Sequence, residues 1–444
     1  MRAEKYLLCA CCALFAPTGC FAEAPKAMTL REYQAQALRG NHELREAALE
    51  AEAAAQAKSG AFTKYFPKLA AGAGIANTNV LPGLSSPIEM LPLTKESNGA
   101  GVAMLTATQP IYAGGRIVNG NRLAEAGKNA ASHQMLMKRN EVLAESEKKY
   151  RQLGILDGRM QTLLAYEKML EALDAQVSQA FERGVASKTD RLRVKLKKDE
   201  VLVKKLQLKK MLEVAEKDLK IYAGISVGDV VRLKEQDETV NPPAVSTETL
   251  RDNLAVRPEY KLLETSVEAA RLQKKMKLGG YLPSFAVGAS VYQADYFKHN
   301  NFSTASTYRD TIAFGMVSIP LSDWWEASHT VKELALKEDV AREKFSALSE
   351  YLLLDMENKL KKHETAYDQV LLAQIGLEEA VANKSEREDG YKNGTEKLSD
   401  YLEALALELD RRDRLVEARA DYFQTRTAFL LATGQAEVLL PAAN

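Results

Sequence analysis

The chain has little cysteine, proline and glycine for its length. Among 444 residues there are 4 cysteines, and all of them, Cys9, Cys11, Cys12 and Cys20, lie near the start. Without that segment the chain has no disulfide and no thiol chemistry. The 13 prolines and 25 glycines form no Ser/Gly-rich linker, which favours one elongated architecture over a string of globular domains.

The chain also lacks an excess of either charge and a long apolar run. It has 60 Lys and Arg against 60 Asp and Glu, so no net field draws it toward nucleic acid. After residue 22, no apolar run reaches the ~18 residues that a membrane-crossing helix needs. If this protein spans a membrane, strands must do so.

The first residues have the composition of a secretory signal peptide. Arg2 and Lys5 precede a short apolar run, and small residues follow it. We expect export and cleavage after Ala22, so that residues 1–22 are the signal peptide. A second interpretation is a lipoprotein with a lipid on Cys20, although Pro17 stands where such signals normally carry leucine. The sequence leaves that choice open.

Helical and strand patterns alternate along the rest of the chain. Residues from about 29 to 62 are rich in Ala, Glu and Gln and predict one helix. Small residues in alternation then predict a hairpin whose long tip includes residues 82–97. From about 116 to 183 there is no proline, and apolar residues recur every seven positions, at Leu156, Leu163, Leu170 and Val177. That period predicts a coiled-coil helix of ~100 Å.

The second half of the chain repeats the first. Pro67 matches Pro283 at a spacing of 216 residues, and Pro110 matches Pro320 at a spacing of 210. The six-residue difference falls between the strands of the hairpin, where a loop tip tolerates deletion. The sequence therefore predicts an internal repeat of one unit, which consists of a helix, a hairpin, a long helix and a return helix.

We predict two repeats after the signal peptide. The first covers 23–240, with its hairpin at about 67–112 and its coiled-coil pair at about 116–222. The second covers 241–444, with a helix at about 247–278, a hairpin at about 283–322 and a coiled-coil pair at about 326–432. The tips at 82–97 and 297–306 are expected to face outward from the cell, because outer loops of membrane barrels are the longer ones.

A strand-to-helix switch follows each predicted hairpin. In the first, Pro110 belongs at a strand end, and Gly114 and Gly115 allow backbone angles that a side chain forbids. In the second, Pro320 precedes Trp324 and Trp325. These tryptophans are expected either at a membrane interface or in plain packing beside the hairpins.

Apolar residues alternate with small or polar ones in both strands of the second hairpin. Phe285, Val287 and Val291 do so in one strand, and Ile312, Phe314 and Met316 in the next. This predicts a sheet with one apolar face, as in a soluble sandwich or in a barrel whose apolar face meets lipid. Four strands cannot close a barrel, so the membrane interpretation requires several chains to pool their strands.

The chain resembles the TolC-like outer-membrane efflux proteins over about residues 28–436. The repeat and a set of short motifs carry the resemblance. The motifs come in pairs, one in each half of the chain, apart from one single motif. The pairs are Asn41-His-Glu43 with Arg257-Pro-Glu259, Tyr65-Phe-Pro67 with Tyr281-Leu-Pro283, and two Gly-x5-Asp turns that end at Asp190 and Asp400. The single motif is Gln109-Pro-Ile-Tyr-Ala-Gly-Gly115.

The resemblance implies a mainly helical homotrimer whose twelve pooled strands form one outer-membrane barrel, continued by a periplasmic helical tunnel. It implies docking onto an inner-membrane transporter through a periplasmic adaptor protein, and export of drugs or other molecules. Some family members hold the tunnel entrance shut with Tyr, Arg and Asp side chains. Tyr391 and Asp400 match that set, but Glu396 stands where the arginine would be.

Acidic residues gather around the two predicted turns. We expect Asp190, Glu396, Asp400 and Glu403 to line the tunnel entrance together with Tyr391. The alternative for each carboxylate is a helix cap or a pairing with a neighbouring cation. Threefold symmetry would bring like charges near the axis, so an entrance of this kind should favour cations.

No motif for catalysis, metal binding or a cofactor stands out. The 5 histidines are scattered without ligand spacing, and no nucleophile, Walker or dinucleotide motif lies between a strand and a helix. We therefore expect no enzyme activity and no cofactor. The interpretation from another class is a soluble periplasmic coiled-coil scaffold or adaptor without a pore.

Overall fold

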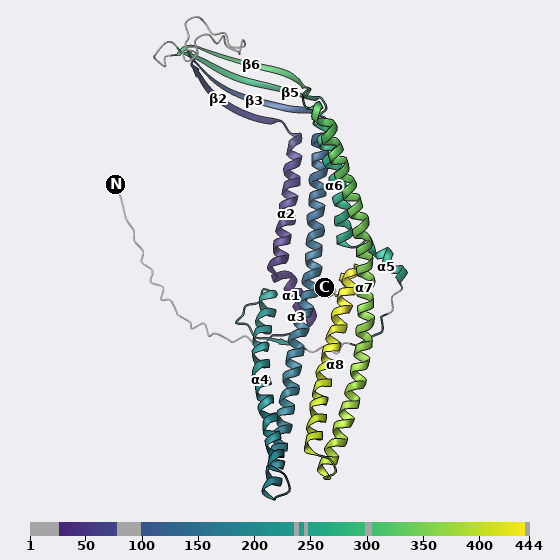
Figure 1. Cartoon of the computed structure of the whole chain (residues 1–444). Coiled ribbons are helices and arrows are strands. Elements are labelled where there is room, and N and C mark those ends of the chain that lie inside the picture. Colours follow the sequence, from purple (N-terminus) through teal and green to yellow (C-terminus); the bar gives the residue numbers. More distant parts are fainter. Residues whose placement is uncertain (1–25, 78–98, 235–238, 244–246, 298–303, 440–444) are drawn as a thin grey trace, which may run out of the picture.

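The protein is a long column of helices with a small sheet at one end (Figure 1). The structure, a computed structural model, describes residues 26–77, 99–234, 239–243, 247–297 and 304–439. The expected signal peptide, Cys20 and the hairpin tip at 82–97 lie outside the described residues, as does most of the tip at 297–306. Within the described residues, no helix is both long and apolar enough to cross a membrane.

Each half of the chain contains a helix, a hairpin, a very long helix and a shorter helix. The elements before residue 240 are β1 (Lys26–Met28), α1 (Leu30–Gly40), α2 (His42–Phe62), η1 (Thr63–Tyr65), β2 (Lys68–Asn77), β3 (Gly99–Ala113), α3 (Arg116–Glu182), α4 (Lys188–Tyr222) and β4 (Val231–Leu233). Those after it are α5 (Thr247–Leu254), α6 (Pro258–Gly279), β5 (Ser284–Phe297), β6 (Thr304–Ser318), α7 (Trp324–Lys392), α8 (Leu398–Ala432) and η3 (Ala436–Leu439). The expected mainly helical fold with a small β part is confirmed.

The two longest helices run most of the length of the column. α3 has 67 residues and α7 has 69, which correspond to ~100 Å each. The seven-residue line predicted in α3 is buried, with Leu170 and Val177 fully inaccessible to solvent. This line packs in one core with Val194 and Val201 of α4 and Leu405 of α8. The coiled-coil period thus identified the packed face correctly.

The prediction of one helix at 29–62 is wrong in one respect. The structure has two helices there, α1 and α2, which meet at Asn41. The Asn41 side chain accepts a hydrogen bond from the backbone N–H of Leu44 and caps α2. Its amide also donates to the carbonyl oxygen of Tyr222 at 3.0 Å. A single buried side chain therefore starts α2 and ties it to the end of α4.

The helix predicted at 247–278 is also two helices. α5 ends at Leu254 and α6 begins with Pro258 at its first position, where proline is well tolerated. Arg257 lies between them with only 4% of its surface exposed, and its guanidinium reaches Asp355 of α7 at 3.1 Å. A buried cation fixes this break, as the Asn41 amide fixes the other.

The short helices meet end to end alongside the long ones. A Cβ atom on Gly40, at the end of α1, would lie 2.2 Å from the carbonyl oxygen of Ala223, just after α4. In the second half, a Cβ on Gly434, just after α8, would lie 3.0 Å from Val256, between α5 and α6. These close approaches agree with the prediction that two short helices together match one long helix.

A second, very small sheet lies beside the middle of the column, and the sequence pattern did not predict it. β1 pairs in parallel with β4 over three residues each. The Tyr150 hydroxyl lies 2.9 Å from the carbonyl oxygens of Met28 and Lys234 and bonds to both strands. The start of the described chain is thereby fastened to α3.

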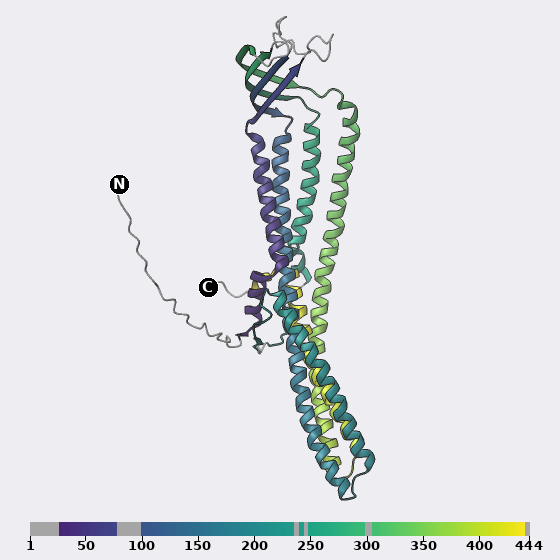
Figure 2. The same ribbon diagram turned by 90° about the vertical axis from the view of Figure 1, so that its left-hand side faces the viewer.

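The main sheet contains four antiparallel strands in the order β2-β3-β5-β6 and curves across the end of the column (Figure 2). β3 and β5, from the two halves of the chain, pair along fourteen positions with one irregularity near Pro110. Within the described residues, β2 and β6 each have one neighbouring strand only. The sheet therefore has two open edges.

The register of the second hairpin corrects the predicted faces. Phe314 pairs with Gly288, and Val287 pairs with Gly315. Directly paired residues of antiparallel strands place their side chains on the same face. The apolar residues of β5 and β6 therefore lie on opposite faces, although each strand alternates as expected.

We name the two faces after residues of the first hairpin. The leucine face carries the apolar or aromatic residues Leu69, Ile75, Leu105, Tyr112, Phe285, Val287, Val291 and Val317 and, toward the hairpin tip, the polar residues Gln293, Asp295 and Arg309. The threonine face carries Lys68, Gly72, Met104, Thr106, Thr108, Gly288, Ser290, Ile312, Phe314 and Met316. The large apolar or aromatic side chains of the leucine face are 44–77% exposed.

Candidate functional site

Two chain reversals lie together at the end of the column farthest from the sheet (Figure 1). One connects α3 to α4 and the other connects α7 to α8. Gly184 and Gly394 both have φ of +74°, a left-handed conformation that lets the last helical carbonyl groups accept bonds from the turn. The expected entrance residues lie at or beside these reversals.

Asp190 takes part in a helix cap. Its carboxylate accepts a hydrogen bond from the Ser187 hydroxyl at 2.6 Å, and that hydroxyl accepts one from the Asp190 backbone N–H at 3.0 Å. The two residues form a complete capping box at the start of α4. The capping alternative is thus realised for Asp190, although its second carboxylate oxygen lies 3.9 Å from Arg193.

Glu396 is paired with a cation that the sequence analysis did not identify. The Arg387 guanidinium donates to its carboxylate at 2.6 Å across the second reversal. The hydrogen bond and the charge of Glu396 raise the pKa of Arg387, and the charge of Asp400 adds to this. An arginine therefore is present beside Asp400, but it comes from α7 rather than from position 396.

Two tyrosines stack at the second reversal. The rings of Tyr391 and Tyr401 are nearly parallel, with centroids 5.9 Å apart. The Tyr401 hydroxyl donates to the sulfur of Met169 on α3 at 3.8 Å, so it joins the two helix pairs. Burial raises the pKa of Tyr391, and the charge of Asp190 on the other pair raises it further. Asp190 therefore lies close enough to Tyr391 for its charge to act on the tyrosine hydroxyl.

The other two acidic residues are placed differently. Asp400 accepts a hydrogen bond from the Ser399 hydroxyl at 2.9 Å and lies in the first turn of α8. Glu403 is exposed, and among the described residues no hydrogen bond or ion pair holds it. The structure thus brings Asp400, Glu396 and Arg387 together, whereas Glu403 is apart from them.

A ladder of opposite charges continues from the second reversal up the α7–α8 pair. Lys392 bonds Glu388 at 2.7 Å, and Lys384 lies 3.7 Å from both Glu388 and Glu408. Glu408 is buried and also accepts a bond from Arg412 at 2.6 Å. These contacts hold the two helices together through paired charges.

The first strand-to-helix switch is a close backbone contact. Gly114 and Gly115 have φ of +62° and +78°, and Gly115 is the N-cap of α3. A Cβ on Gly114 would lie 2.0 Å from the carbonyl oxygen of Gly279 at the end of α6. No larger residue fits there, so the glycines lock the first hairpin onto the second half of the chain. Pro110 lies at the one irregularity of the β3–β5 ladder.

The second switch is built from side chains. Trp324 and Trp325 are the first residues of α7, after the extended turn that contains Pro320. The Trp324 indole donates to the carbonyl oxygen of Tyr281, before β5, at 2.8 Å. Trp325 is 84% exposed. An indole hydrogen bond thus replaces the glycine contact of the first switch.

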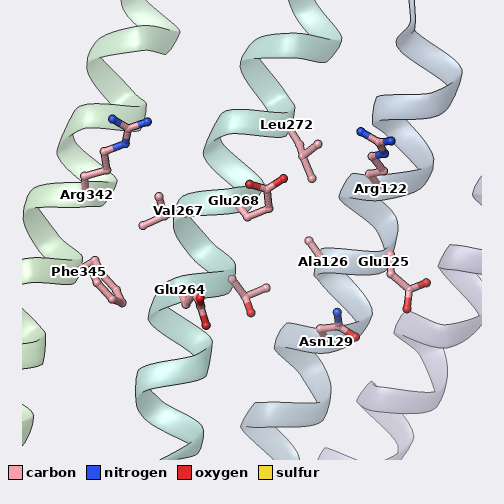
Figure 3. A pocket seen from close by; sticks show the side chains of 11 residues that line it. Arg122, Glu125, Ala126, Asn129, Glu264, Val267, Glu268, Leu272, Arg342 and Phe345 are labelled. Carbon is pink, nitrogen blue, oxygen red and sulfur yellow. The ribbon is translucent and has the colours of Figure 1, made fainter. Parts of the chain in front are cut away.

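A shallow groove of about 630 Å³ lies between α3, α6 and α7, and Figure 3 shows its lining side chains. Its floor includes Ala126 and Leu272, which are buried. Its rim carries both charges, and two rim groups are paired, Glu125 with Lys58 and Arg342 with Glu338. The groove offers no group of residues suited to a reaction, and the described residues contain no cluster of potential metal ligands.

The chain is similar to outer-membrane efflux proteins. Residues 34–224 match the family model of that name, "Outer membrane efflux protein". Over 427 residues, the chain is 22% identical to outer membrane protein TolC of Salmonella enteritidis, a match that covers 93% of this chain and 83% of that protein.

Solved structures share the fold. The outer membrane protein VceC of Vibrio cholerae superposes with a TM-score of 0.77 at 14% identity, over 91% of this chain and 96% of that chain. The CmeC outer membrane channel of Campylobacter jejuni gives 0.75 at 17% identity, over 92% and 86%. Mostly helical columns with a small sheet are common to all three.

Proposed function

We propose that this chain, a TolC-like outer-membrane efflux protein, works as a homotrimeric exit duct that lets molecules pass from the periplasm to the outside. It performs no chemistry on its cargo. Its role follows from shape: a tunnel of helices that ends in a barrel of strands. The single observation that carries the proposal is the open sheet whose leucine face exposes large apolar side chains.

An open sheet of this kind is not stable in lipid as a single copy. The edges β2 and β6 leave backbone N–H and C=O groups without partners in the described chain, and such groups cost several kcal/mol each in a bilayer. Pairing β6 of one copy with β2 of the next removes both edges. Four strands from each of three copies would close a barrel of twelve.

The strands have the length and surface for that environment. β3 and β6 have 15 residues each, more than the 9–11 that a tilted membrane strand needs. The leucine face would meet lipid, and the threonine face would line the lumen. A soluble scaffold has no use for an exposed apolar sheet face, so this observation favours the channel over the scaffold.

The helical part would form the tunnel wall. The twofold internal repeat gives each copy two long helices and two columns of stacked short ones, so three copies would supply twelve columns. This tunnel would lie in the periplasm, where an adaptor protein would link it to an inner-membrane transporter. Selection of the cargo, drugs or other exported molecules, would rest with those partners.

The two reversals would form the entrance. Three copies of Asp190, Glu396, Asp400 and Glu403 would face the axis together with Tyr391. Arg387 offsets part of this negative charge, and Asp190 is engaged in its cap. Asp400 and Glu403 would therefore contribute most to a preference for cations.

The junction of sheet and column would lie at the periplasmic membrane interface. Several aromatic side chains at this level are exposed: Phe62 at 53%, Tyr65 at 38%, Phe66 at 53%, Trp324 at 47% and Trp325 at 84%. Tryptophan and tyrosine gather at membrane interfaces because each combines an apolar ring with a polar N–H or O–H group. Trp325 would thus contact lipid headgroups, and Trp324 would hold the switch.

Membrane partition combined with cross-linking tests the proposal. The protein should stay in the outer-membrane fraction after high-salt and carbonate washing, and a cross-linker should capture trimers in mild detergent. A scaffold would leave the membranes in the wash. Monomers alone after cross-linking, together with release into the wash, would exclude the exit duct.

A further inference from the structure

Three apolar side chains of β6 lie in neighbouring rows on the threonine face. Ile312 pairs with Ser290, Phe314 with Gly288, and Met316 with Ala286. On the neighbouring β3 the same cross-strand rows continue with Thr106 and Thr108. Beside Ile312 the Thr106 and Ser290 hydroxyls are 2.9 Å apart and hydrogen-bonded.

The far end of the Phe314 ring lies over Gly288 of β5. A Cβ atom on Gly288 would come within 2.5 Å of the ring and within 2.8 Å of the carbonyl oxygen of Ala107 on β3. The glycine therefore leaves the space that the ring occupies. Ile312 and Phe314 are half-buried, and Met316 is 51% exposed. Together they form a compact apolar patch, which we name the β6 patch.

Burial along β5 distinguishes the two faces of the sheet. Phe285, Val287 and Val291 of the leucine face are exposed, whereas Ser284, Gly288 and Ser290 of the threonine face are half-buried. The threonine face is therefore the more shielded side of this strand, as the inner side of a curved sheet is.

We propose that the β6 patch faces the lumen and gives the apolar part of a cationic, amphiphilic cargo a contact on the barrel wall. This inference rests on the proposed trimeric barrel, in which the patch occurs three times. The ring face of Phe314 attracts organic cations through its quadrupole. Ile312 and Met316 add apolar surface beside it.

The first test asks which face is wet. Phe314→Cys and Val287→Cys place a thiol on each face at neighbouring positions, in a chain with no other cysteine after residue 20. A charged, water-soluble methanethiosulfonate added to the open channel in a planar bilayer should lower the conductance of Phe314→Cys alone. A response of Val287→Cys alone would overturn the assignment.

The second test asks what the patch does. Block by tetrabutylammonium, relative to tetramethylammonium, is measured in Phe314→Ser and in the control Val287→Ser. Loss of a cation–ring contact should weaken the block by about two- to tenfold in Phe314→Ser only. Equal block in Phe314→Ser and the unaltered protein would refute a cargo contact.

These outcomes are separate from failure of the exit duct. If the unaltered protein forms no channel, the proposed function fails and the inference fails with it. If it conducts and neither cysteine variant responds, the exit duct stands and the β6 patch does not face the lumen.

Discussion

The two reversals at the end of the column have the same backbone turn but are held by different interactions. Gly184 and Gly394 have identical φ, and a helix of 35 residues follows each. The first reversal is closed by its own capping box at Ser187 and Asp190. The second has no side-chain cap at Lys397 and relies on the Arg387–Glu396 pair and the tyrosine stack.

This difference suggests that the first reversal keeps its conformation, whereas the second can change its conformation. A capping box is local, and salt or a neighbouring chain affects it little. An exposed ion pair is screened by salt, and a ring stack between α7 and α8 depends on how these helices lie. If the two reversals form the entrance as proposed, we expect α7 and α8 to move when it opens, while α3 and α4 stay in place.

Removing the tyrosine stack should have the largest effect. Tyr401 is 5% exposed, so Tyr401→Ala should cost about 3–5 kcal/mol through the cavity it leaves. Amide hydrogen exchange should become faster at the start of α8. Phe181, at the end of α3, is the counterpart at the first reversal, with its ring centroid 5.7 Å from the guanidinium of Arg191 on α4. Phe181→Ala should leave α4 protected, because the capping box still closes that turn. Equal exchange in both variants would contradict the difference between the turns.

Alkaline pH should weaken the second reversal. Burial, then the charges of Glu388 and Glu408, raises the pKa of Tyr401 to about 12, against about 10 in the unfolded chain. Because the folded pKa is the higher one, the stability from neutral Tyr401 is complete below pH ~10 and is lost as pH rises through ~12. The ultraviolet tyrosinate titration of the unaltered protein minus that of Tyr401→Phe should show this late midpoint. A midpoint near 10 would show that the ring is not buried.

Substitutions of Asp190 and Asp400 should differ in their effect on stability and should together lower the preference for cations. Asp190→Ala removes a capping box and should cost about 1 kcal/mol, whereas Asp400→Ala should change stability by less than about 0.5 kcal/mol. Reversal potentials under a salt gradient should show less cation preference in the double variant, with trimer assembly intact. Unchanged selectivity would place both residues away from the entrance.

The smallest effect should come from the exposed ion pair. Glu396→Gln removes the partner of Arg387, and proteolysis at the second reversal should rise slightly at low salt. Near 1 M salt the variant and the unaltered protein should behave alike, because such pairs are screened. Glu403→Gln serves as the control and should have no effect on proteolysis at any salt concentration.

Periodicity explains what the sequence could predict. The seven-residue line through Leu163 and Leu170 located the core of α3, and prolines and glycines marked its ends within one residue. The break at Asn41 was missed because helix-forming residues lie on both sides of it. β1 and β4 are three residues each, too short for a pattern.

Long-range geometry explains what it could not. The faces of β5 and β6 depend on their register, which alternation within each strand does not determine. Arg387 was missed because it reaches Glu396 only after the chain has reversed at Gly394. The number of residues between Arg387 and Glu396 fits no helical period. The resemblance to the family also predicted the arginine at position 396, and not at position 387.

A planar lipid bilayer tests the central claim most directly. Purified, unaltered protein added to one side should produce uniform steps of current, each from one trimer, that carry cations more readily than anions. The absence of any current steps from protein that is trimeric in detergent would contradict the claim that this chain forms an exit duct.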